Sequence, residues 1–518
     1  MRHNLFLIAC LFAVYSAFAQ QPTDQLWHLL PNSKKGNSGI GLAEAQEMMK
    51  GKTPQTVIVA IADAGVDINH EDLKNMLWIN ADEVADNGID DDNNGYIDDI
   101  YGWNFIGETT HDNLEITRQY ALLNAKYELK ATDDIENQDE YNRYLTIKQE
   151  FLQKNSDAKL YYERFLQIKQ GMEFLEDSYG TDMTAEEVTN HKSKSKYEEI
   201  ARGILARTAE ASKNFNYLDI KTQLMSAYNH YDASYNYNYN PEFDPRTELV
   251  GDDYSNAREI GYGNNKVYYG EHSSHGTHVA GIVAADASND VGAKGICQSC
   301  DIMSIRNVPD GDERDKDVAN GIRYAVDNGA KIVNMSFGKG YSHNAEVVKE
   351  ATQYAASKGV LLVHAAGNSN QNNDISDNFP NDFNNITDNW IEVGASSWMK
   401  KPKVFAEFSN YGLEEVDIFA PGVDIYSTTP EGQYEAFNGT SMASPVVAGV
   451  AGYVWSYYPT LTAAQLKQIL VESAVEIKGR SRLPGSKKKT KACKISKYGS
   501  EVNLPAALRL AEKMTTGQ

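Results

Sequence analysis

Cysteine is scarce in this chain of 518 residues, and its scarcity excludes several classes of protein. The four cysteines are Cys10, Cys297, Cys300 and Cys493. So few exclude a disulfide-dense scaffold, and a structural zinc site would need a second CxxC pair. The CxxC pair of Cys297 and Cys300 can form a local disulfide in an exported protein, whereas a redox motif needs a thioredoxin-like context that is absent. Cys493 is then an odd thiol.

Positive charge is also in short supply. The chain has 49 Lys and Arg against 72 Asp and Glu, which gives a formal net charge of −23. Because nucleic-acid binding depends on a basic surface that neutralises phosphates, this balance argues against a nucleic-acid partner. It suits a soluble, exported protein but selects no substrate.

Long apolar runs are confined to the N-terminus. A short basic start precedes LFLIACLFAVYSAF, and Ala17-Phe18-Ala19 offers a cleavage site. The combination predicts a secretory signal peptide over residues 1–19. A membrane anchor is the alternative, but the run is short for one and no stop-transfer pattern follows. Lipidation at Cys10 is a second alternative, although apolar residues continue after it. We expect export to the periplasm or the exterior without a transmembrane anchor.

Apolar runs of strand length recur elsewhere. They are short, nearly continuous and rich in Val and Ile, as in strands buried on both faces. The predicted strands are VIVAIAD (Val57–Asp63), DIMSIRNV (Asp301–Val308), KIVNMSF (Lys331–Phe337) and VLLVHAAGN (Val360–Asn368). Segments of helical period lie between them, such as Asp317–Gly329 and Glu346–Gly359, and both end in a glycine typical of a helix C-cap. The alternation predicts an α/β fold with a mostly parallel sheet.

The middle of the chain is charged, Tyr-rich and helical in period. In EYNRYLTIKQEFLQ, residues at intervals of three and four are Tyr141, Tyr144, Leu145, Lys148, Phe151 and Leu152. We expect a mainly helical inserted subdomain, with Ser234–Pro245 as a loop. The chain thus divides into a signal peptide at 1–19, an α/β domain formed by 20–106 and 262–518, and an insertion at 107–261.

Nucleophilic acyl transfer needs a hydroxyl, a base, an orienting carboxylate and donors for the oxyanion. Ser441 in NGTSMASP is the candidate hydroxyl. Pro445 fits the first turn of a helix, so Ser441 is expected near a helix N-terminus, where the dipole favours negative charge. The alternative is a small residue in a tight turn.

The base, the carboxylate and the amide donor also have candidates. HSSHGTHVAGIVAA holds His272, His275 and His278 at intervals of three, which raises a metal site as an alternative. However, Gly276 interrupts the helical face, and His275 is the best-placed base. Asp63 and Asn368 each end a predicted strand, where the chemistry of α/β sheets concentrates.

The blocks DAGVDINHEDL, HGTHVAGI, VNMSFG, AAGN and NGTSMASP, with FSNYG and FAPG, resemble the subtilisin family of serine endopeptidases. They occur in that family's order of Asp, His and Ser. The resemblance implies a subtilisin-like sheet with helices on both faces. It also implies Asp63 as orienting acid, His275 as general base and Ser441 as nucleophile. Asn368 would be an oxyanion donor, and the backbone edge that pairs with an extended substrate would be Ser336, Phe337 and Gly338.

The resemblance covers the chain from about Trp27 to 106 and from about 262 onward. Ala64 stands where the family often has Thr or Ser. Asp63 and His275 are 212 residues apart, where relatives commonly have a few dozen. The helical insertion resembles those of exported subtilases of Bacteroidetes type. Because only about forty residues separate the signal peptide from Asp63, we hypothesise that the insertion shields the cleft or substitutes for an inhibitory prodomain.

An acidic segment, NGIDDDNNGYIDD (Asn87–Asp99), has the spacing of an oxygen-ligand loop for calcium. The expected ligands are Asp90, Asp92, Asn94, Tyr96 and Asp98, around Gly95. Tyr101 stands at the twelfth position in place of Glu, so the segment is not an intact EF-hand. A solvated acidic turn is the alternative.

The expected partners are protein or peptide substrates of a monomeric enzyme. Asp374 and Asp377, which follow Asn368, and the segment Asp310–Asp315 raise a preference for basic side chains as a hypothesis. Two rival functions remain. One is a metal-dependent hydrolase built on the three histidines, and the other is a catalytically masked scaffold that acts in binding.

Overall fold

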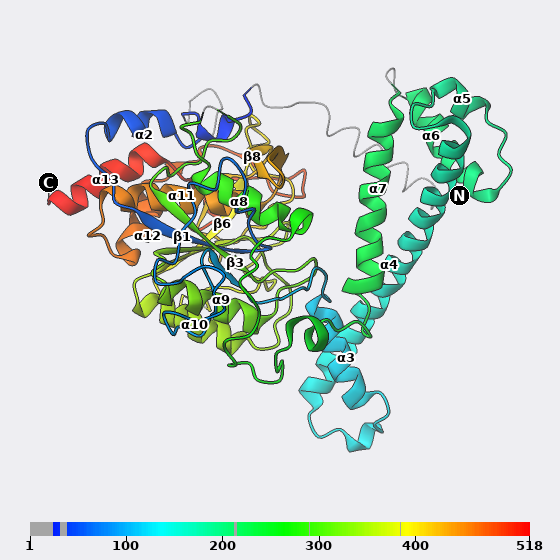
Figure 1. Cartoon of the computed structure of the whole chain (residues 1–518), viewed down its shortest axis with the longest axis horizontal. Helices are drawn as coiled ribbons and strands as arrows, with labels where there is room; N and C mark the ends of the chain where they lie inside the picture. The colour runs from blue at the N-terminus through cyan, green and yellow to red at the C-terminus, as the bar shows by residue number, and fades with distance from the viewer. Residues whose placement is uncertain (1–23, 32–38, 212–214, 290, 384, 518) are drawn as a thin grey trace. The chain divides into compact units, whose positions relative to one another are not determined.

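The computed structural model describes residues 24–31, 39–211, 215–289, 291–383 and 385–517. The predicted signal peptide lies outside the described residues. The chain forms two compact units, coloured along the chain in Figure 1. The sheet unit comprises Met1–Glu108, Arg246–Val308 and Glu313–Gln518. The helical unit comprises Thr109–Pro245 and Pro309–Asp312.

A nine-stranded sheet, of order β10-β13-β7-β6-β5-β4-β1-β3-β2, forms the centre of the sheet unit. All its pairings are parallel except that of β10 with β13. The strands are β1 (Val57–Asp63), β2 (Gly102–Asn104), β3 (Cys300–Arg306), β4 (Ile332–Met335), β5 (Leu361–Ala365), β6 (Trp390–Ser396), β7 (Ile418–Pro421), β10 (Val475–Glu476) and β13 (Ser500–Glu501). Two hairpins lie apart from this sheet: β8 (Ile425–Thr429) with β9 (Gln433–Phe437), and β11 (Ser481–Arg482) with β12 (Lys489–Thr490).

The strands have apolar residues on both faces because each face supports a separate core. In β1, Val57, Val59 and Ile61 belong to one buried cluster, and Ala60 and Ala62 belong to the other. This alternation follows from the two-residue period of a strand. It explains why the sequence shows continuous apolar runs there.

Helices cover both faces of the sheet, as Figure 1 shows. The face with Ala60 packs on α9 (Asp315–Asp327) and α10 (Ala345–Ser357). The opposite cluster includes residues of α2 (Leu42–Met48), α8 (Ser274–Ala284), α11 (Thr440–Tyr457), α12 (Ala463–Glu472) and α13 (Leu504–Thr516). The predicted α/β fold is confirmed. The β1 prediction agrees in both bounds, and the other three predicted strands extend past the observed ends into loops.

The helical unit has a hydrophobic core of its own, formed by residues between Phe165 and Leu224. Its helices are α3 (Glu115–Tyr127), α4 (Gln138–Tyr179), α5 (Ala185–Asn190), α6 (Lys196–Ala211) and α7 (Tyr217–Ala233). Asn137 caps the 42-residue α4 by accepting from the N–H of Glu140. The first residues of the expected loop, Ser234–Asn238, instead continue α7 as a π-helical turn.

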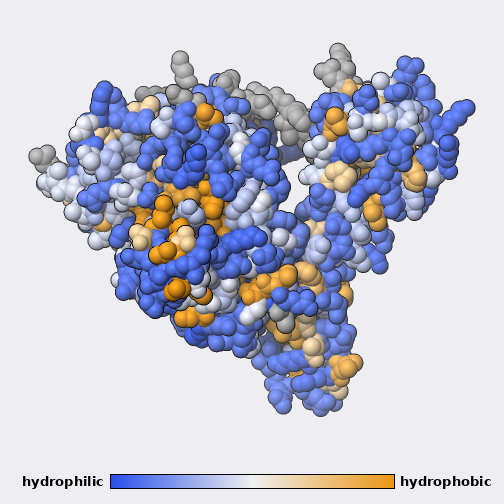
Figure 2. Space-filling model, in the orientation of Figure 1, coloured by the Kyte–Doolittle hydropathy of each residue, from blue (hydrophilic) through white to orange (hydrophobic). Residues whose placement is uncertain are grey.

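The surface of the helical unit is mostly polar, but it carries some apolar side chains. Hydrophilic colours predominate on the face shown in Figure 2. Leu145 and Leu152, two residues of the helical period in α4, are 45% and 48% exposed. Tyr144 and Phe151 on the same helix are buried. Within the described ranges, none of the helices combines the length and apolarity needed to cross a bilayer.

The helical unit includes four residues that are distant in sequence from the rest of it. Pro309–Asp312 lie between β3 and α9 in the chain. Their backbone bonds to Thr110 and Asp112, with Asp310 N to Thr110 O at 2.8 Å and Asp112 N to Asp310 O at 3.0 Å. The Asp312 carboxylate accepts from the N–H of Glu115, the first residue of α3. The chain therefore passes between the two units four times.

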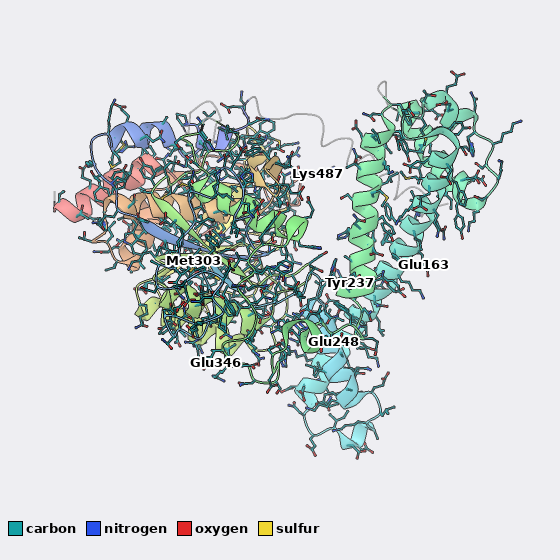
Figure 3. All side chains as sticks on the ribbon, viewed as in Figure 1. Glu163, Tyr237, Glu248, Met303, Glu346 and Lys487 are labelled. Carbon is teal, nitrogen blue, oxygen red and sulfur yellow. A yellow bond between two sulfur atoms is a disulfide. The ribbon has the colours of Figure 1, made fainter. Side chains whose placement is uncertain are left out.

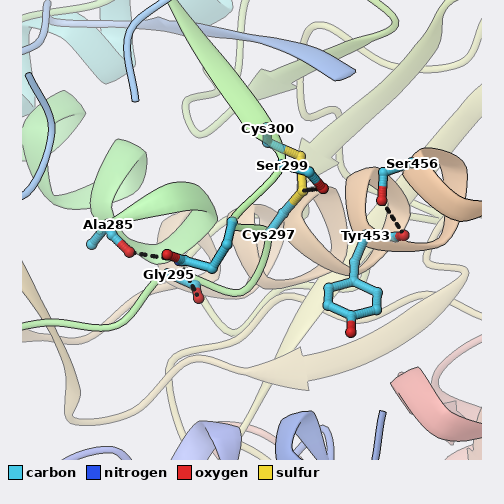
Figure 4. Close-up of a disulfide and its surroundings, with 8 residues drawn as sticks. Ala285, Gly295, Cys297, Ser299, Cys300, Tyr453 and Ser456 are labelled. Atoms are coloured by element: carbon cyan, nitrogen blue, oxygen red, sulfur yellow. Dashed lines mark hydrogen bonds between the residues drawn. A yellow bond between two sulfur atoms is a disulfide. The ribbon is translucent and has the colours of Figure 1, made fainter. Parts of the chain in front are cut away.

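Side chains fill the space between the sheet and its helices, as Figure 3 shows for β3 around Met303, which is fully buried. Cys297 and Cys300 form a disulfide, with their Cα atoms 5.4 Å apart (Figure 4). Both residues are fully buried, and the disulfide packs on α11 at Gly452, where a Cβ would lie 2.4 Å from Cys300 Sγ. The local disulfide that the sequence allowed is therefore formed, and Cys493 is free and exposed.

Candidate active site

Asp63 and His275 form a hydrogen-bonded pair at the end of β1. Asp63 is 1% exposed, and its two carboxylate oxygens lie 2.8 and 3.0 Å from His275 Nδ1. The N–H of Ala64 also donates to Asp63, at 2.7 Å. Because an ionised carboxylate only accepts, Nδ1 carries a proton, and in the neutral ring Nε2 is left as a base.

Gly276 lets the helix that carries His275 approach the end of β1. A Cβ at this position would lie 2.2 Å from the carbonyl oxygen of Gly65 and 3.1 Å from Asp63 Cβ. His275 is the second residue of α8, and its side chain is 40% exposed. The ring is thus fixed at one edge and open at another.

The pKa of His275 lies above its ordinary value of 6.5. Burial alone lowers it, but the charge of Asp63 and its hydrogen bond raise the pKa by more. A proton taken up by this imidazole is therefore stabilised by the carboxylate behind it, as a general base requires.

Ser441 is the second residue of α11, in agreement with its predicted place near a helix N-terminus. Pro445 lies deeper in the helix than the expected first turn. Since proline has no N–H, it leaves the carbonyl of Ser441 without its intrahelical partner. The hydroxyl of Ser336 donates to that carbonyl at 2.9 Å, and Asn334 Nδ2 in turn donates to the Ser336 hydroxyl. This polar contact fixes the start of α11 against the end of β4.

Asn368 lies beside Ser441, and within the described ranges its amide nitrogen makes no hydrogen bond. Its Oδ1 accepts from the backbone N–H and the hydroxyl of Thr440, at 2.9 and 3.0 Å. A Cβ on Gly439 would lie 3.5 Å from both Asn368 Nδ2 and the N of Ser441. The glycine therefore leaves a space that two N–H donors face. An oxygen that develops negative charge would be stabilised there.

The sheet brings these groups together because β5, β4 and β1 are neighbours. Asp63, Ser336 and Asn368 follow or end these three strands at the same edge. The Ser441 hydroxyl donates to the carbonyl of Ser336 at 3.1 Å. Among the residues that the structure describes, no hydrogen bond joins Ser441 to His275. The Asp63–His275 pair and Ser441 are thus two separately bonded groups in this structure.

The backbone after β4 presents an unpaired edge. Ser336 is 3% exposed, Phe337 is half-buried and Gly338 is exposed. In the described part of the chain, no backbone hydrogen bond involves Phe337 or Gly338, and the next residue, Lys339, pairs with Phe379. A Cβ on Gly338 would lie 2.6 Å from Asn378 Oδ1, a neighbour that the sequence did not indicate.

The three histidines do not converge. His278 is fully buried, stacks on Phe437 at 4.2 Å and has its Nε2 3.1 Å from the carbonyl of Glu435. Burial lowers the pKa of His278 to about 3. Within the described ranges, one group of side chains lies close enough together to share a metal ion, and it contains none of these histidines.

That group is Glu83, Asp90 and Asp92, whose ligand oxygens lie within 4.8 Å of one another. Two of its members were expected and Glu83 was not. The Asp98 carboxylate accepts from the N–H groups of Asn87 and Gly88. Asn94 bonds to Asp92 through its backbone and side chain, and the Tyr96 ring packs edge-on against Trp103. Carboxylate oxygens are the ligands that calcium prefers, so the three acids fit that ion.

The acids expected near the substrate have structural partners. Asp374 accepts from the N–H groups of Leu413, Glu414 and Glu415. It also lines an acidic cavity of about 310 Å³ with Asp377, Asn378, Glu392 and Glu415, among others. Burial and the nearby carboxylates raise the pKa of Glu415 to about 7. Asp315 pairs with the buried Lys339 at 2.8 Å.

Known proteins are similar in sequence to this chain. A sequence model described as the subtilase family, Peptidase_S8, matches residues 54–499. The chain is 36% identical over 212 residues to subtilisin DY of Bacillus licheniformis, covering 40% of this chain and 73% of that protein. It is 37% identical over 208 residues to subtilisin E of Bacillus subtilis strain 168, covering 40% of this chain and 52% of that one. Among solved structures, sphericase is similar, with 32% identity, a TM-score of 0.38, and 43% and 76% of the two chains covered.

Proposed function

Since this chain belongs to the subtilase family of serine endopeptidases, we propose that it cleaves proteins through Ser441, His275 and Asp63. The observation that carries the proposal is the hydrogen bond of Asp63 to His275 Nδ1, at the same sheet edge as the helix start that bears Ser441. An extended peptide would pair with the free backbone of Phe337 and Gly338 by β-augmentation.

In the first step, Ser441 attacks the carbonyl carbon of the scissile bond while its proton passes to His275 Nε2. The hydroxyl must first leave the Ser336 carbonyl, which accepts it at 3.1 Å. Rotation about one side-chain bond breaks this contact. Substrate that binds beside Ser336 would favour that rotation.

In the tetrahedral intermediate, the oxyanion would accept from Asn368 Nδ2 and the N–H of Ser441. Thr440 holds Asn368 through both of its donors, so the amide nitrogen is oriented before substrate arrives. Preorganised donors of this kind lower the barrier because they need no reorientation during the reaction.

The protonated His275 would then give its proton to the leaving amine, which departs and leaves an ester on Ser441. Water then takes the place of the amine. His275 accepts a proton from this water as the water oxygen attacks the ester carbon. The second intermediate collapses to release the carboxylate product and restore the serine. Asp63 stabilises the imidazolium in both halves of the cycle.

We also propose that Glu83, Asp90 and Asp92 hold a calcium ion, with help from oxygens of the same loop. Their closeness supports the proposal, since three ionised carboxylates within a few ångströms repel one another without a cation. Calcium would act there as a structural ion. Export through an N-terminal signal peptide and a monomeric state remain parts of the proposal.

Reaction with a fluorophosphonate probe tests the central proposal. Wild type should be labelled and should hydrolyse casein, whereas Ser441→Ala should do neither and keep the same melting temperature. Ser444→Ala is a matched control, since Ser444 also lies on α11 but is fully buried and donates to Asn334. A folded wild type that takes no label would favour the masked scaffold instead.

A further inference from the structure

The C-terminal part of the sheet unit carries an unusually dense group of cations. Between residues 478 and 497 there are nine Lys and Arg and no Asp or Glu, in a chain whose net charge is −23. This segment, which we call the basic hairpin, includes β11 and β12. Soluble surfaces usually intersperse both signs of charge. A segment with one sign alone therefore suggests an anionic partner.

A second basic loop lies against the basic hairpin. The carbonyl of Pro402 accepts from the N–H of Arg482 and from the hydroxyl of Ser481, both at 2.8 Å. Lys400, Lys401 and Lys403 flank Pro402 and are exposed. The two segments thus form one continuous cationic surface. Its exposed members in the basic hairpin are Lys478, Arg480, Lys487, Lys488, Lys489, Lys491, Lys494 and Lys497.

This positive charge is largely unneutralised within the chain. Among the described residues, the one ion pair in the basic hairpin joins Arg482 to Glu407 at 3.9 Å. Lys497 donates to the amide oxygen of Asn385 and acts electrostatically on Glu415 and Asp417, so its charge is partly offset. Lys487, labelled in Figure 3, and its two neighbours have no carboxylate within ion-pair distance in the described part of the chain. Their charge remains available to a ligand.

The turn of the basic hairpin contacts the segment that leaves the candidate active site. A Cβ on Gly485 would lie 2.6 Å from the side-chain amide carbon of Asn370. Asn370 is two residues beyond Asn368, and its N–H donates to the carbonyl of Phe408. Gly485 donates to the carbonyl of Glu407, the residue before Phe408. With about 3.3–3.6 Å per extended residue and the side-chain contact between Gly485 and Asn370, Lys487 lies within roughly 20 Å of Asn368.

We propose that the basic hairpin binds an acidic stretch of the polypeptide substrate and so selects proteins with Asp or Glu near the cleavage site. The inference rests on the proposed endopeptidase function. An extended peptide covers roughly 20 Å in about six residues, so the acidic positions lie up to about six residues from the scissile bond. A polypeptide fits better than nucleic acid, because the strongly acidic remainder of the chain repels a long polyanion.

Cleavage of paired peptides tests this selection. The two peptides share one cleavage site. The first peptide carries three Glu residues four to six positions from that site on each side, and the second peptide carries Gln at the same positions. We expect kcat/KM about tenfold higher for the acidic peptide, since several exposed charge pairs each contribute little but act together. Raising NaCl from about 50 to about 300 mM should reduce the preference, because salt screens exposed charges.

Charge-matched variants assign the effect. Lys487→Gln, Lys488→Gln and Lys489→Gln together should abolish the preference and leave cleavage of the Gln peptide unchanged. Lys192→Gln, Lys194→Gln and Lys196→Gln remove the same charge from exposed positions of the helical unit and should preserve it. Absence of a preference in wild type, or its survival in the first variant, overturns the proposal.

Binding to Ser441→Ala separates this surface from catalysis. Fluorescence anisotropy should show tighter binding of the acidic peptide than of the Gln peptide, with the difference lost in the basic hairpin variant. If wild type cleaves neither peptide but this binding pattern holds, the proposed endopeptidase function is refuted and the proposed binding of acidic peptide by the basic hairpin is supported. If a single-stranded oligonucleotide of equal charge binds more tightly than the acidic peptide, recognition of acidic polypeptide is refuted.

Discussion

At the scale of single residues, Pro445 and Ser336 act on one carbonyl group. Pro445 denies the carbonyl of Ser441 its helical partner, and Ser336 replaces that partner at 2.9 Å. Ser441, the proposed nucleophile, is therefore positioned through its backbone, since among the described residues its hydroxyl bonds to the carbonyl of Ser336 alone. A buried carbonyl left unsatisfied costs about 1–3 kcal/mol, which is why this contact matters for the helix start.

Asn368 should matter for rate more than for binding. Asn368→Ala removes one of two oxyanion donors, and kcat should fall by about 10²–10³ with little change in KM, which is the loss that removal of one such donor causes in a subtilisin. Steady-state kinetics on a peptide anilide measures the two constants. Thr440→Val keeps the amide nitrogen and removes one bond that orients it, so its loss should be smaller. Equal losses in both variants would contradict the donor role.

His275 should set the acid limb of the pH profile. Its imidazole must be neutral to accept a proton, and its pKa is raised by Asp63, so kcat/KM should fall as pH drops through a value above 6.5. In Asp63→Asn the charge is lost, and the limb should move to lower pH while kcat falls by about 10⁴. Profiles of kcat/KM between about pH 5 and 9 measure this. A limb that does not move in the variant would show that another group titrates.

At the scale of elements, the acidic loop before β2 joins the sheet through buried contacts. Asp99 is fully buried and accepts from Tyr324 on α9 and from Asn80. Burial raises the pKa of Asp99 to about 6. The hydrogen bond between Asp99 and Tyr324 thus links the conformation of this loop to α9, a helix that covers the sheet.

Calcium should stabilise the sheet unit through this loop. At a hundredfold excess over Kd, a bound ion adds about 2.7 kcal/mol to the free energy of unfolding, so EGTA should lower the melting temperature. Glu83→Gln should remove most of this response. Asp98→Asn, whose carboxylate bonds to backbone N–H groups, should lower stability equally with and without calcium. Calorimetry with and without calcium measures the melting temperatures of wild type and both variants. A calcium response that is intact in Glu83→Gln would refute the ligand set.

The elements also show what the sequence can predict. The bounds of β1 agree because the six residues before Asp63 are apolar, and all of them except Ile58 are buried. Glu83 escaped the loop pattern because it lies outside the repeat of ligand spacings, and only folding brings it to Asp90 and Asp92. The sequence did not indicate Asn334 for a similar reason. Its side chain bonds to Ser336 and to Ser444 on α11, and these contacts form only when the helix packs on the strand.

At the scale of the whole molecule, each of the two units has its own core. The two segments of the sheet unit that flank residues 109–245 are bonded to each other, since the N–H of Glu108 donates to the carbonyl of Leu249 at 3.2 Å. A buried ion-pair group fixes the segment after this point, with Arg246 bonded to Asp252 and Asp317. The sheet unit therefore has an ordered return path without residues 109–245.

Replacement of residues 109–245 by a short Gly-Ser linker tests whether the helical unit assists folding. If it substitutes for a prodomain, the variant should refold from guanidinium more slowly and in lower yield, although the chain ends to be joined are adjacent. Recovery of peptidase activity over time measures this, and separately expressed 109–245 is the rescue control. A variant that refolds and cleaves like wild type would end the idea.

The four residues Pro309–Asp312 have a consequence for how such an architecture can be exchanged between proteins. They complete the base of the helical unit but are encoded far from the rest of it. A recombination event that moved one continuous stretch of gene would carry residues 109–245 and leave this piece behind. Residues 109–245 are thus insufficient to transfer the helical unit to another protein. A recipient protein would need a loop of its own that makes the contacts of Pro309–Asp312.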